Sequence, residues 1–140
     1  MKIKTMKYPN NLDDCYKIRK EVFVDEQGFK DEFDEIDKSC LHLCVYEEGN
    51  AVATGRMFLN DQREMTIGRV CVIAKYRGLG YGNAVILELE KIAKSEGFSE
   101  VHLSSQVKAK KFYEKLGYTS SGEEYLDQHE PHIHMKKELK

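Results

Sequence analysis

Arg77-Gly78-Leu79-Gly80-Tyr81-Gly82 is the stretch that decides how this chain folds. It lies between a β-rich segment and a segment whose apolar residues have helical spacing. Glycine permits backbone angles and close approaches that a Cβ would prevent, and a helix that begins after such a loop presents unpaired N–H groups. Such helix ends bind anions, and Arg77 adds a guanidinium that can hydrogen-bond phosphate. We therefore predict a turn that binds a pyrophosphate.

Two other phosphate-binding motifs do not fit this loop. It lacks the Gly-Lys-Ser/Thr ending of a Walker A motif, which disfavours NTP hydrolysis. Its spacing is G-x-G-x-G, not the G-x-G-x-x-G of a dinucleotide fold, and no βαβ unit leads into it. A tight turn without a ligand is the simpler alternative, but the adjacent arginine and the strand-to-helix setting favour binding. The sequence calls for another ligand that carries a pyrophosphate.

The segments before the loop predict a strand, a helix and a three-stranded meander. The helix has Asn10 or Asn11 as its cap and ends before Gly28. Residues 27–38 are acidic and irregular, with Phe29, Phe33 and Ile36 spaced to pack against the body. The strands are expected at residues 3–6, 40–46, 51–59 and 65–72.

After the loop, the spacing of the apolar residues changes to that of a helix. Val85, Leu89, Ile92 and Ala93 mark one helix face, and Gly97 is suited to end that helix. A second helix over 109–116 is ended by Gly117. Strands are expected at residues 101–104, 118–125 and 133–139. The order of elements predicts an α/β (α+β) fold with a mixed sheet.

Composition limits the class of protein. The 140 residues fit one domain, with 41% hydrophobic and 33% charged residues, as in a soluble globular protein. No segment resembles a signal peptide or a membrane span, so we expect a cytoplasmic protein. The net charge of −2 has no basic stripe, which argues against nucleic acid as a partner. The four scattered cysteines are expected to be reduced, mostly core thiols.

At this point the residues resemble a known family. Residues 77–82 match the R/Q-x-x-G-x-G/A motif of the GNAT N-acetyltransferase superfamily, and Phe112-Tyr113-Glu114-Lys115-Leu116-Gly117-Tyr118 is similar to its FYxKxGF signature. The segments 18–27 (IRKEVFVDEQ), 35–37 (EID) and 131–135 (PHIHM) resemble the ElaA/YjcF-like branch. The last of these is also similar to a segment of glyphosate N-acetyltransferases.

The resemblance implies one GNAT domain over residues 1–140. Its mixed, mostly antiparallel sheet would have six to seven strands, with a splayed parallel pair, here 65–72 and 101–104, and flanking helices. It implies acetyl-CoA as cosubstrate, with its pyrophosphate on the loop and its pantetheine between the splayed strands. The implied cofactor-binding residues are Val70, Cys71, Val72, Arg77, Gly78, Leu79, Gly80, Tyr81, Gly82, Lys110 and Tyr113.

The resemblance also implies catalytic residues. Tyr113 matches the tyrosine that family members place beside the CoA sulfur as general acid, and a phenol suits donation to a thiolate. His132 matches the base of the glyphosate-acetylating relatives. An imidazole suits this role because it accepts a proton near neutrality. Glu26, Glu35 or a chain of waters could be the base instead. Direct transfer in a ternary complex is favoured over an acyl group carried on Cys71.

The acceptor residues stay open at this stage. Arg19, Glu26, Arg69 and Gln106 stand where family members contact the acceptor. Two arginines favour an acceptor that carries a carboxylate or phosphate, whereas acidic residues such as Glu26, Glu35 and Asp37 favour a cationic one. The expected partner is a small-molecule amine, and a homodimer is compatible with so small a domain.

No metal site is expected. Cys40 and Cys44 in the Cys40-x-His42-x-Cys44 stretch would lie roughly 13 Å apart in a strand, too far to share one zinc ion. His129, His132 and His134 form a looser group. Two alternatives to small-molecule N-acetylation remain, a non-catalytic acyl-CoA-binding module and a protein lysine acetyltransferase.

Overall fold

Seven strands form one mixed sheet in the computed structural model, which describes residues 1–140. Their spatial order is β1-β2-β3-β4-β5-β7-β6, and every neighbouring pair is antiparallel except β4 and β5. The strands are β1 (Lys2–Met6), β2 (Leu41–Glu47), β3 (Asn50–Leu59), β4 (Met65–Val72), β5 (Glu100–Gln106), β6 (Thr119–Asp127) and β7 (Glu130–Glu138). The expected α/β fold with a seven-stranded, mostly antiparallel sheet is confirmed.

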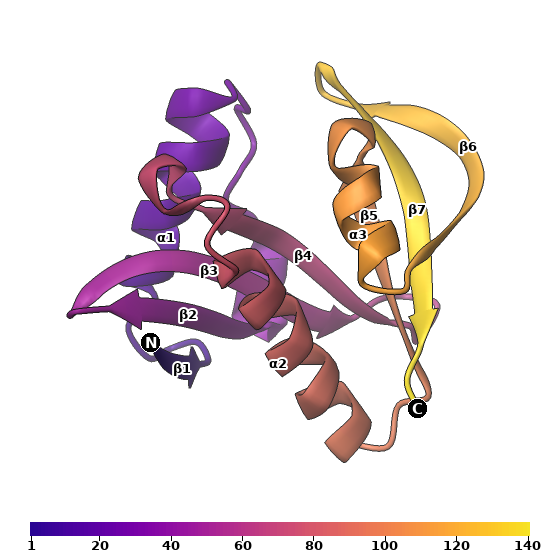
Figure 1. Ribbon diagram of the computed structural model, residues 1–140, viewed down its shortest axis with the longest axis horizontal. Coiled ribbons are helices and arrows are strands. Elements are labelled where there is room, and N and C mark those ends of the chain that lie inside the picture. The colour runs from indigo at the N-terminus through magenta and orange to yellow at the C-terminus, as the bar shows by residue number, and fades with distance from the viewer.

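Helices cover both faces of the sheet (Figure 1). The α-helices are α1 (Asp13–Arg19), α2 (Tyr81–Ser95) and α3 (Lys110–Lys115). On one face Cys15, Ile18 and Val22 form a small buried cluster with strand residues. On the other face Val85 and Leu89 of α2 belong to the main core, which continues to α3. The sheet is therefore the middle layer of three.

The expected first helix is the element that differs most from the prediction. Its N-cap is Leu12 instead of Asn10 or Asn11, although Asn11 Oδ1 accepts a hydrogen bond from the Asp13 N–H at 2.8 Å. At Arg19, α1 changes into a π-helix over Lys20–Glu26. In the next segment Phe29 is buried, as expected, whereas Phe33 and Ile36 are 46% and 41% exposed. Phe33 nevertheless packs against the body as expected, since its ring lies 5.0 Å from the Tyr16 ring and 5.2 Å from the Arg19 guanidinium. Ile36 lies at the surface instead.

The two halves of the sheet separate after a short contact. β4 and β5 pair only at Thr66 with His102 and at Ile67 with Leu103. From that point they diverge, and Figure 1 shows the β1–β4 half and the β5–β7 half opening away from each other. The backbone groups along the facing edges beyond these pairs have no partner in the other strand.

A β-bulge in β4 accompanies this divergence. Thr54 pairs with Cys71 and Arg56 with Gly68, so Gly55 of β3 faces two residues of β4. One of them, Arg69, has a φ of 52°. In a strand, side chains alternate between the two faces of the sheet, and an extra residue shifts this alternation by one beyond the bulge. Ile67 therefore packs in the main core, while Cys71, four residues later, packs against α1.

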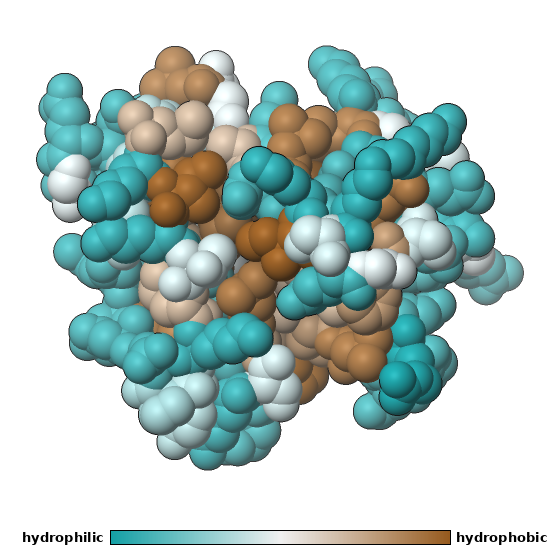
Figure 2. All heavy atoms as spheres, turned by 90° about the horizontal axis from the view of Figure 1, so that it is seen from below, coloured by the Kyte–Doolittle hydropathy of each residue, from teal (hydrophilic) through white to brown (hydrophobic).

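The surface is mostly hydrophilic on the face that Figure 2 shows, with hydrophobic side chains visible across its middle. None of the helices is both long and apolar enough to span a membrane. All four cysteines are free and buried, as the sequence predicts.

Gly55→Ala tests how closely α2 packs on the sheet. A Cβ on Gly55 would lie 2.6 Å from Val85 Cγ1 and 3.2 Å from Leu89 Cδ1. Overpacking of this kind typically costs about 1–3 kcal/mol, so we expect a loss of that size in the free energy of unfolding, measured with urea. Gly68→Ala is the matched control, since its Cβ would have no neighbour closer than 3.9 Å. Equal stability of the two variants would contradict this packing.

Candidate active site

A cavity of about 950 Å³ lies where the two halves separate. Its walls come from the divergent parts of β4 and β5, the glycine loop, the first turn of α2, α3, the Gln27–Glu32 segment and the end of the β6–β7 hairpin. The sequence-predicted residues that line it are Arg69, Val70, Cys71, Val72, Arg77, Gly78, Gly80, Tyr81, Gly82, Gln106, Tyr113 and His132. The structure thus brings together most of the predicted site.

Four predicted residues do not line the cavity. Leu79 is 66% exposed, and the Lys110 side chain lies outside the wall, although Lys108 is part of it. Glu26 is bonded to Arg77. Arg19 is 1% exposed and lies beneath the site. In this structure, Arg19 and Glu26 are therefore not free to bind an acceptor.

The glycine loop presents backbone donors to the cavity. Gly78 and Gly80 have φ angles of 78° and 90°, which favour glycine, and Gly80 is the N-cap of α2. No side chain caps this helix, so its first-turn N–H groups stay free for an anion. Gly82 lets α3 approach, because a Cβ there would lie 3.2 Å from Phe112 Cζ.

Arg77 is held by the protein itself. Its Nη1 and Nη2 donate to the Glu26 carboxylate at 2.7 and 2.6 Å, and its Nε donates to the Val72 carbonyl at 2.9 Å. The hydrogen bond from Arg77 lowers the pKa of Glu26. These bonds use three of the five N–H donors of the guanidinium and offset its charge, so the loop amides are the donors that have no competing partner in the protein.

Tyr113 reaches the cavity from α3. The side chain is 9% exposed, packs edge-on against Phe112 and Tyr118, and makes no hydrogen bond within the protein. Burial raises the pKa of the Tyr113 phenol well above its ordinary value, and the neighbouring Cys71 adds to the effect. Tyr113 is therefore protonated at any physiological pH and able to donate its proton into the cavity.

His132 faces the same cavity from β7. Its Nδ1 lies 2.8 Å from the Glu130 carbonyl oxygen, which can only accept, so Nδ1 carries a proton. In the neutral ring Nε2 is then the acceptor, and no protein group bonds to it. The ring is 7% exposed, stacks on Tyr125 at 6.2 Å and meets Phe29 edge-on at 6.4 Å. These contacts fix both the tautomer and the direction of the ring.

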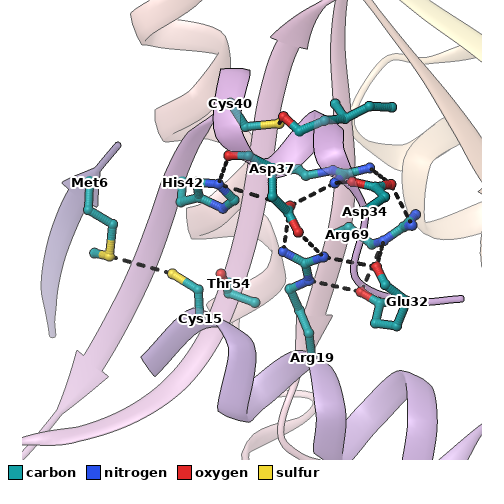
Figure 3. A network of polar contacts seen from close by, with 12 residues as sticks. Met6, Cys15, Arg19, Glu32, Asp34, Asp37, Cys40, His42, Thr54 and Arg69 are labelled. Carbon is teal, nitrogen blue, oxygen red and sulfur yellow. Dashed lines mark hydrogen bonds and ion pairs between the residues drawn. The ribbon is translucent and has the colours of Figure 1, made fainter. Parts of the chain in front are cut away.

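Below the cavity lies a buried network of ion pairs (Figure 3). Arg19 bonds to Glu32 at 2.8 Å and to both Asp37 oxygens at 2.9 and 3.1 Å. Arg56 bonds to Asp37 at 2.7 Å and to both oxygens of Asp34 at 2.7 and 3.1 Å. The network joins α1, β3 and the acidic segment, which explains why that segment turns its carboxylates inward.

Arg69 connects the network to the cavity. Its Nε lies 3.0 Å from a Glu32 carboxylate oxygen and its Nη2 lies 3.3 Å from Asp34. Burial raises the pKa of Glu32, and the arginines only partly offset this. Arg69 lines the cavity as predicted, but its charge is already neutralised by two carboxylates.

Sequence reasoning missed the residues that the acidic segment contributes. Gln27, Phe29, Asp31 and Glu32 all line the cavity, together with Asp127 of the hairpin. The available signal was a run of acidic residues, 31–37, interrupted only by Phe33 and Ile36. Glu35, considered as an alternative base, pairs with Lys38 on the surface, and the carboxylate of Asp37 is buried in the network.

A group of potential metal ligands, Asp37, Cys40 and His42, has its donor atoms within 4.8 Å of one another. Arg19 and Arg56 both bond to the Asp37 carboxylate. The Cys40 thiol donates to the Ile36 carbonyl at 3.2 Å, and burial raises its pKa to about 11. Two guanidinium groups at the same carboxylate repel a cation, so this group is a structural part of the network.

The fold and the cavity define the class of protein. Two splayed parallel strands, a glycine loop at a helix N-terminus, and a tyrosine and a histidine that face one cavity are the arrangement that the resemblance to an acyltransferase family predicts. The acetyltransferase (GNAT) family model matches residues 10–118, and the chain belongs to this family. It is therefore an acyltransferase, with acetyl-CoA as its cosubstrate.

Individual relatives agree with this assignment. The chain is 36% identical over 141 residues to YjcF of Bacillus subtilis, an uncharacterized N-acetyltransferase, and the match covers 99% of this chain and 100% of that one. The crystal structure of Escherichia coli ElaA is 25% identical, has a TM-score of 0.86, and is matched over 97% of this chain and 98% of that one. An aminoglycoside 6'-N-acetyltransferase crystallised with coenzyme A shares the fold at 16% identity, with a TM-score of 0.79 and coverage of 99% and 97%.

Asp37→Asn tests the network. Burial tends to raise the pKa of Asp37, but hydrogen bonds and charge from Arg19 and Arg56 outweigh it and hold the pKa below its ordinary value. Removing one partner of a buried pair typically costs about 3–5 kcal/mol. We expect a loss of that size in the free energy of unfolding at pH 7, measured with urea.

The pH dependence has a definite sign. A carboxyl group with a lowered pKa stabilises the fold above its unfolded-state pKa, and this contribution is lost as the pH falls through the folded-state value. The difference between wild type and Asp37→Asn should therefore shrink below about pH 4. Asp61→Asn, at an exposed turn, is the control. A pH-independent difference would contradict the charged role of Asp37.

Proposed function

We propose that this protein transfers the acetyl group of acetyl-CoA to a primary amine of a small molecule, by direct attack in a ternary complex. The supporting observation is that the Tyr113 hydroxyl and the His132 Nε2 open onto the same cavity, and neither has a hydrogen-bond partner in the protein. Both groups are therefore available to a bound substrate, one as a donor and the other as an acceptor.

The cavity fits acetyl-CoA. Its volume of about 950 Å³ accommodates a long ligand, and the unpaired edges of β4 and β5 offer backbone groups to the amides of a pantetheine arm. The loop amides from Gly78 to Gly82 are placed for the pyrophosphate. Acetyl-CoA supplies an acyl group that its thioester has already activated. What remains for the protein is to orient the amine and to move two protons.

His132 is the proposed base. Its Nε2 takes the proton that the amine loses as the new N–C bond forms, and the Glu130 carbonyl keeps the ring in the tautomer that can accept it. Aromatic contacts from Phe29 and Tyr125 hold the ring in place during this transfer.

Tyr113 is the proposed acid. It gives its proton to the sulfur as the C–S bond breaks. Burial raises the pKa of the phenol, so the phenol carries its proton when the reaction begins. Direct attack is favoured over a covalent route because burial also raises the pKa of the neighbouring Cys71 far above its ordinary value. A thiol that stays protonated is a poor nucleophile.

Thiol release from acetyl-CoA in the presence of a panel of primary amines tests the activity, with mass spectrometry of the acetylated product. Turnover with at least one amine is expected. Binding of CoA without release of thiol for any amine would favour a non-catalytic module. Acetylated lysines in a treated lysate, with no small-molecule turnover, would favour a protein lysine acetyltransferase.

Tyr113→Phe should lower kcat by about 10²-fold or more, the usual contribution of a general acid. The Kd for CoA, measured by calorimetry, should stay within a few-fold because only one hydroxyl is lost. Tyr16→Phe, which removes a hydroxyl outside the cavity, is the control. An unchanged kcat in Tyr113→Phe would remove Tyr113 from the acid role.

His132→Ala should lower kcat/KM most at neutral pH and recover part of it as the pH rises, because a growing fraction of the amine is then already deprotonated. The measurement is the pH–rate profile of kcat/KM. His134→Ala, two residues along β7, is the control because His134 does not line the cavity. A profile for His132→Ala with the shape of the wild-type profile would count against this base.

A further inference from the structure

We propose that the acceptor is a cationic amine, one that carries a second positive charge besides the amine that is acetylated. This inference rests on the proposed function and names the chemical class of its acceptor. It follows from the charges around the opening of the cavity near His132, which we call the acceptor mouth. The acceptor mouth is formed by the segment Gln27–Glu32 and by the β6–β7 turn, residues 127–130.

Contacts between these two segments hold the acceptor mouth together. The Lys30 N–H donates to Gln128 Oε1 at 2.8 Å, and the rings of Phe29 and His129 lie 4.8 Å apart. From β5, Gln106 Nε2 donates to Gln27 Oε1 at 2.8 Å. The acceptor mouth is therefore a built structure that joins the two halves of the sheet across the cavity.

The reactive end of an acceptor is fixed by His132. Phe29, a member of the acceptor mouth, meets the His132 ring at 6.4 Å. His132 is only 7% exposed, and its unpaired Nε2 belongs to the cavity wall. An amine bound at Nε2 therefore has the rest of its molecule in or near the acceptor mouth.

The cations around this end of the cavity are neutralised by the protein. Arg56 and Arg69 are paired with Asp34, Asp37 and Glu32. Lys108 is paired with Glu130 at 3.0 Å. These cations are therefore poor partners for a carboxylate or phosphate on the acceptor, which the sequence had left open.

Two carboxylates stay unpaired. Asp31 and Asp127 both line the cavity, both are exposed, and neither forms an ion pair with a cation of the protein. Asp31 follows Lys30 in the chain and Asp127 precedes Gln128, and a hydrogen bond joins Lys30 to Gln128. The two carboxylates therefore belong to the same opening. The Lys30 side chain itself is exposed and is not part of the cavity wall. With Lys30 counted, the acceptor mouth has two unpaired carboxylates and one unpaired ammonium, so its free charge is still negative, and only the carboxylates line the cavity.

A second ammonium or guanidinium group on the acceptor would meet this free charge while the first amine lies at His132. The two carboxylates would favour the protonated, cationic form of the second amine and would speed the encounter of such an acceptor with the protein. An acceptor with an anionic tail would be repelled. A neutral amine would gain nothing from Asp31 and Asp127. The predicted preference is therefore cationic over neutral over anionic.

Calorimetry with three matched amines tests this order without requiring turnover. The probes are 1,5-diaminopentane, hexylamine and 6-aminohexanoate, which carry an ammonium, a methyl and a carboxylate at the far end. Each is titrated into protein saturated with CoA. We expect the diamine to bind most tightly and Asp31→Asn/Asp127→Asn to weaken it by about tenfold, as for two partly exposed ion pairs. Hexylamine affinity should not change.

Asp61→Asn/Glu123→Gln is the charge-matched control, since both residues are exposed and outside the cavity wall. It should bind the diamine like the wild type. Equal binding of the three probes, no binding of the diamine, tighter binding of 6-aminohexanoate, or an unchanged diamine affinity in Asp31→Asn/Asp127→Asn would each overturn the proposal.

The same proteins separate this inference from the proposed function. Thiol release should show a KM for the diamine that rises about tenfold in Asp31→Asn/Asp127→Asn, with the KM for acetyl-CoA unchanged. If the diamine binds and the binding depends on Asp31 and Asp127, but no thiol is released, acetyl transfer is overturned and the cation-binding acceptor mouth is supported. Thiol release that is fastest with 6-aminohexanoate would support transfer and overturn the cationic acceptor.

Discussion

The contact between β4 and β5 is the constraint on which the rest of the structure depends. Parallel strands need regular, evenly spaced hydrogen bonds to stay together, and here the pairing stops at Ile67 and Leu103. Beyond that point the two halves of the sheet each continue with their own antiparallel partners. The space between them becomes a cavity whose walls carry unpaired backbone groups, which is what an extended ligand with amide groups requires.

The divergence is maintained by side chains as well as by the backbone. The bulge opposite Gly55 turns Arg69 into a conformation with positive φ, and the Arg69 guanidinium is bonded to Glu32 and Asp34. These carboxylates are in turn held by buried Arg19 and Arg56. The network therefore links the irregular strand to the acidic segment, which forms part of the cavity wall. A change in the network would be transmitted to the position of Phe29 and Asp31.

The site combines groups from both halves. The β1–β4 half contributes the bulged strand and the acidic segment, and the other half contributes Tyr113 and His132. Most cations of the cavity are neutralised by neighbouring carboxylates, whereas the Tyr113 hydroxyl, the His132 Nε2 and the loop N–H groups have no partner in the protein. The unpaired charges that line the cavity near His132 are those of Asp31 and Asp127, whereas the opposite end of the cavity has the loop amides. One cavity thus offers donors to phosphate at one end and acceptors to an amine at the other.

The sequence by itself determined the order of elements and the glycine loop, because spacing and local backbone preference are written in neighbouring residues. Tyr113 and His132 were indicated only by the resemblance of their segments to the family motifs. It could not show that Arg77 is bonded to Glu26, that Arg19 is buried, or that Asp31 and Asp127 line the same cavity. Those facts depend on which distant charges meet after folding, and a chain contains many carboxylates that could serve each arginine. The extent of the splay was likewise decided only by tertiary structure, since a bulge is fixed by the partner strand and the helix packed on it.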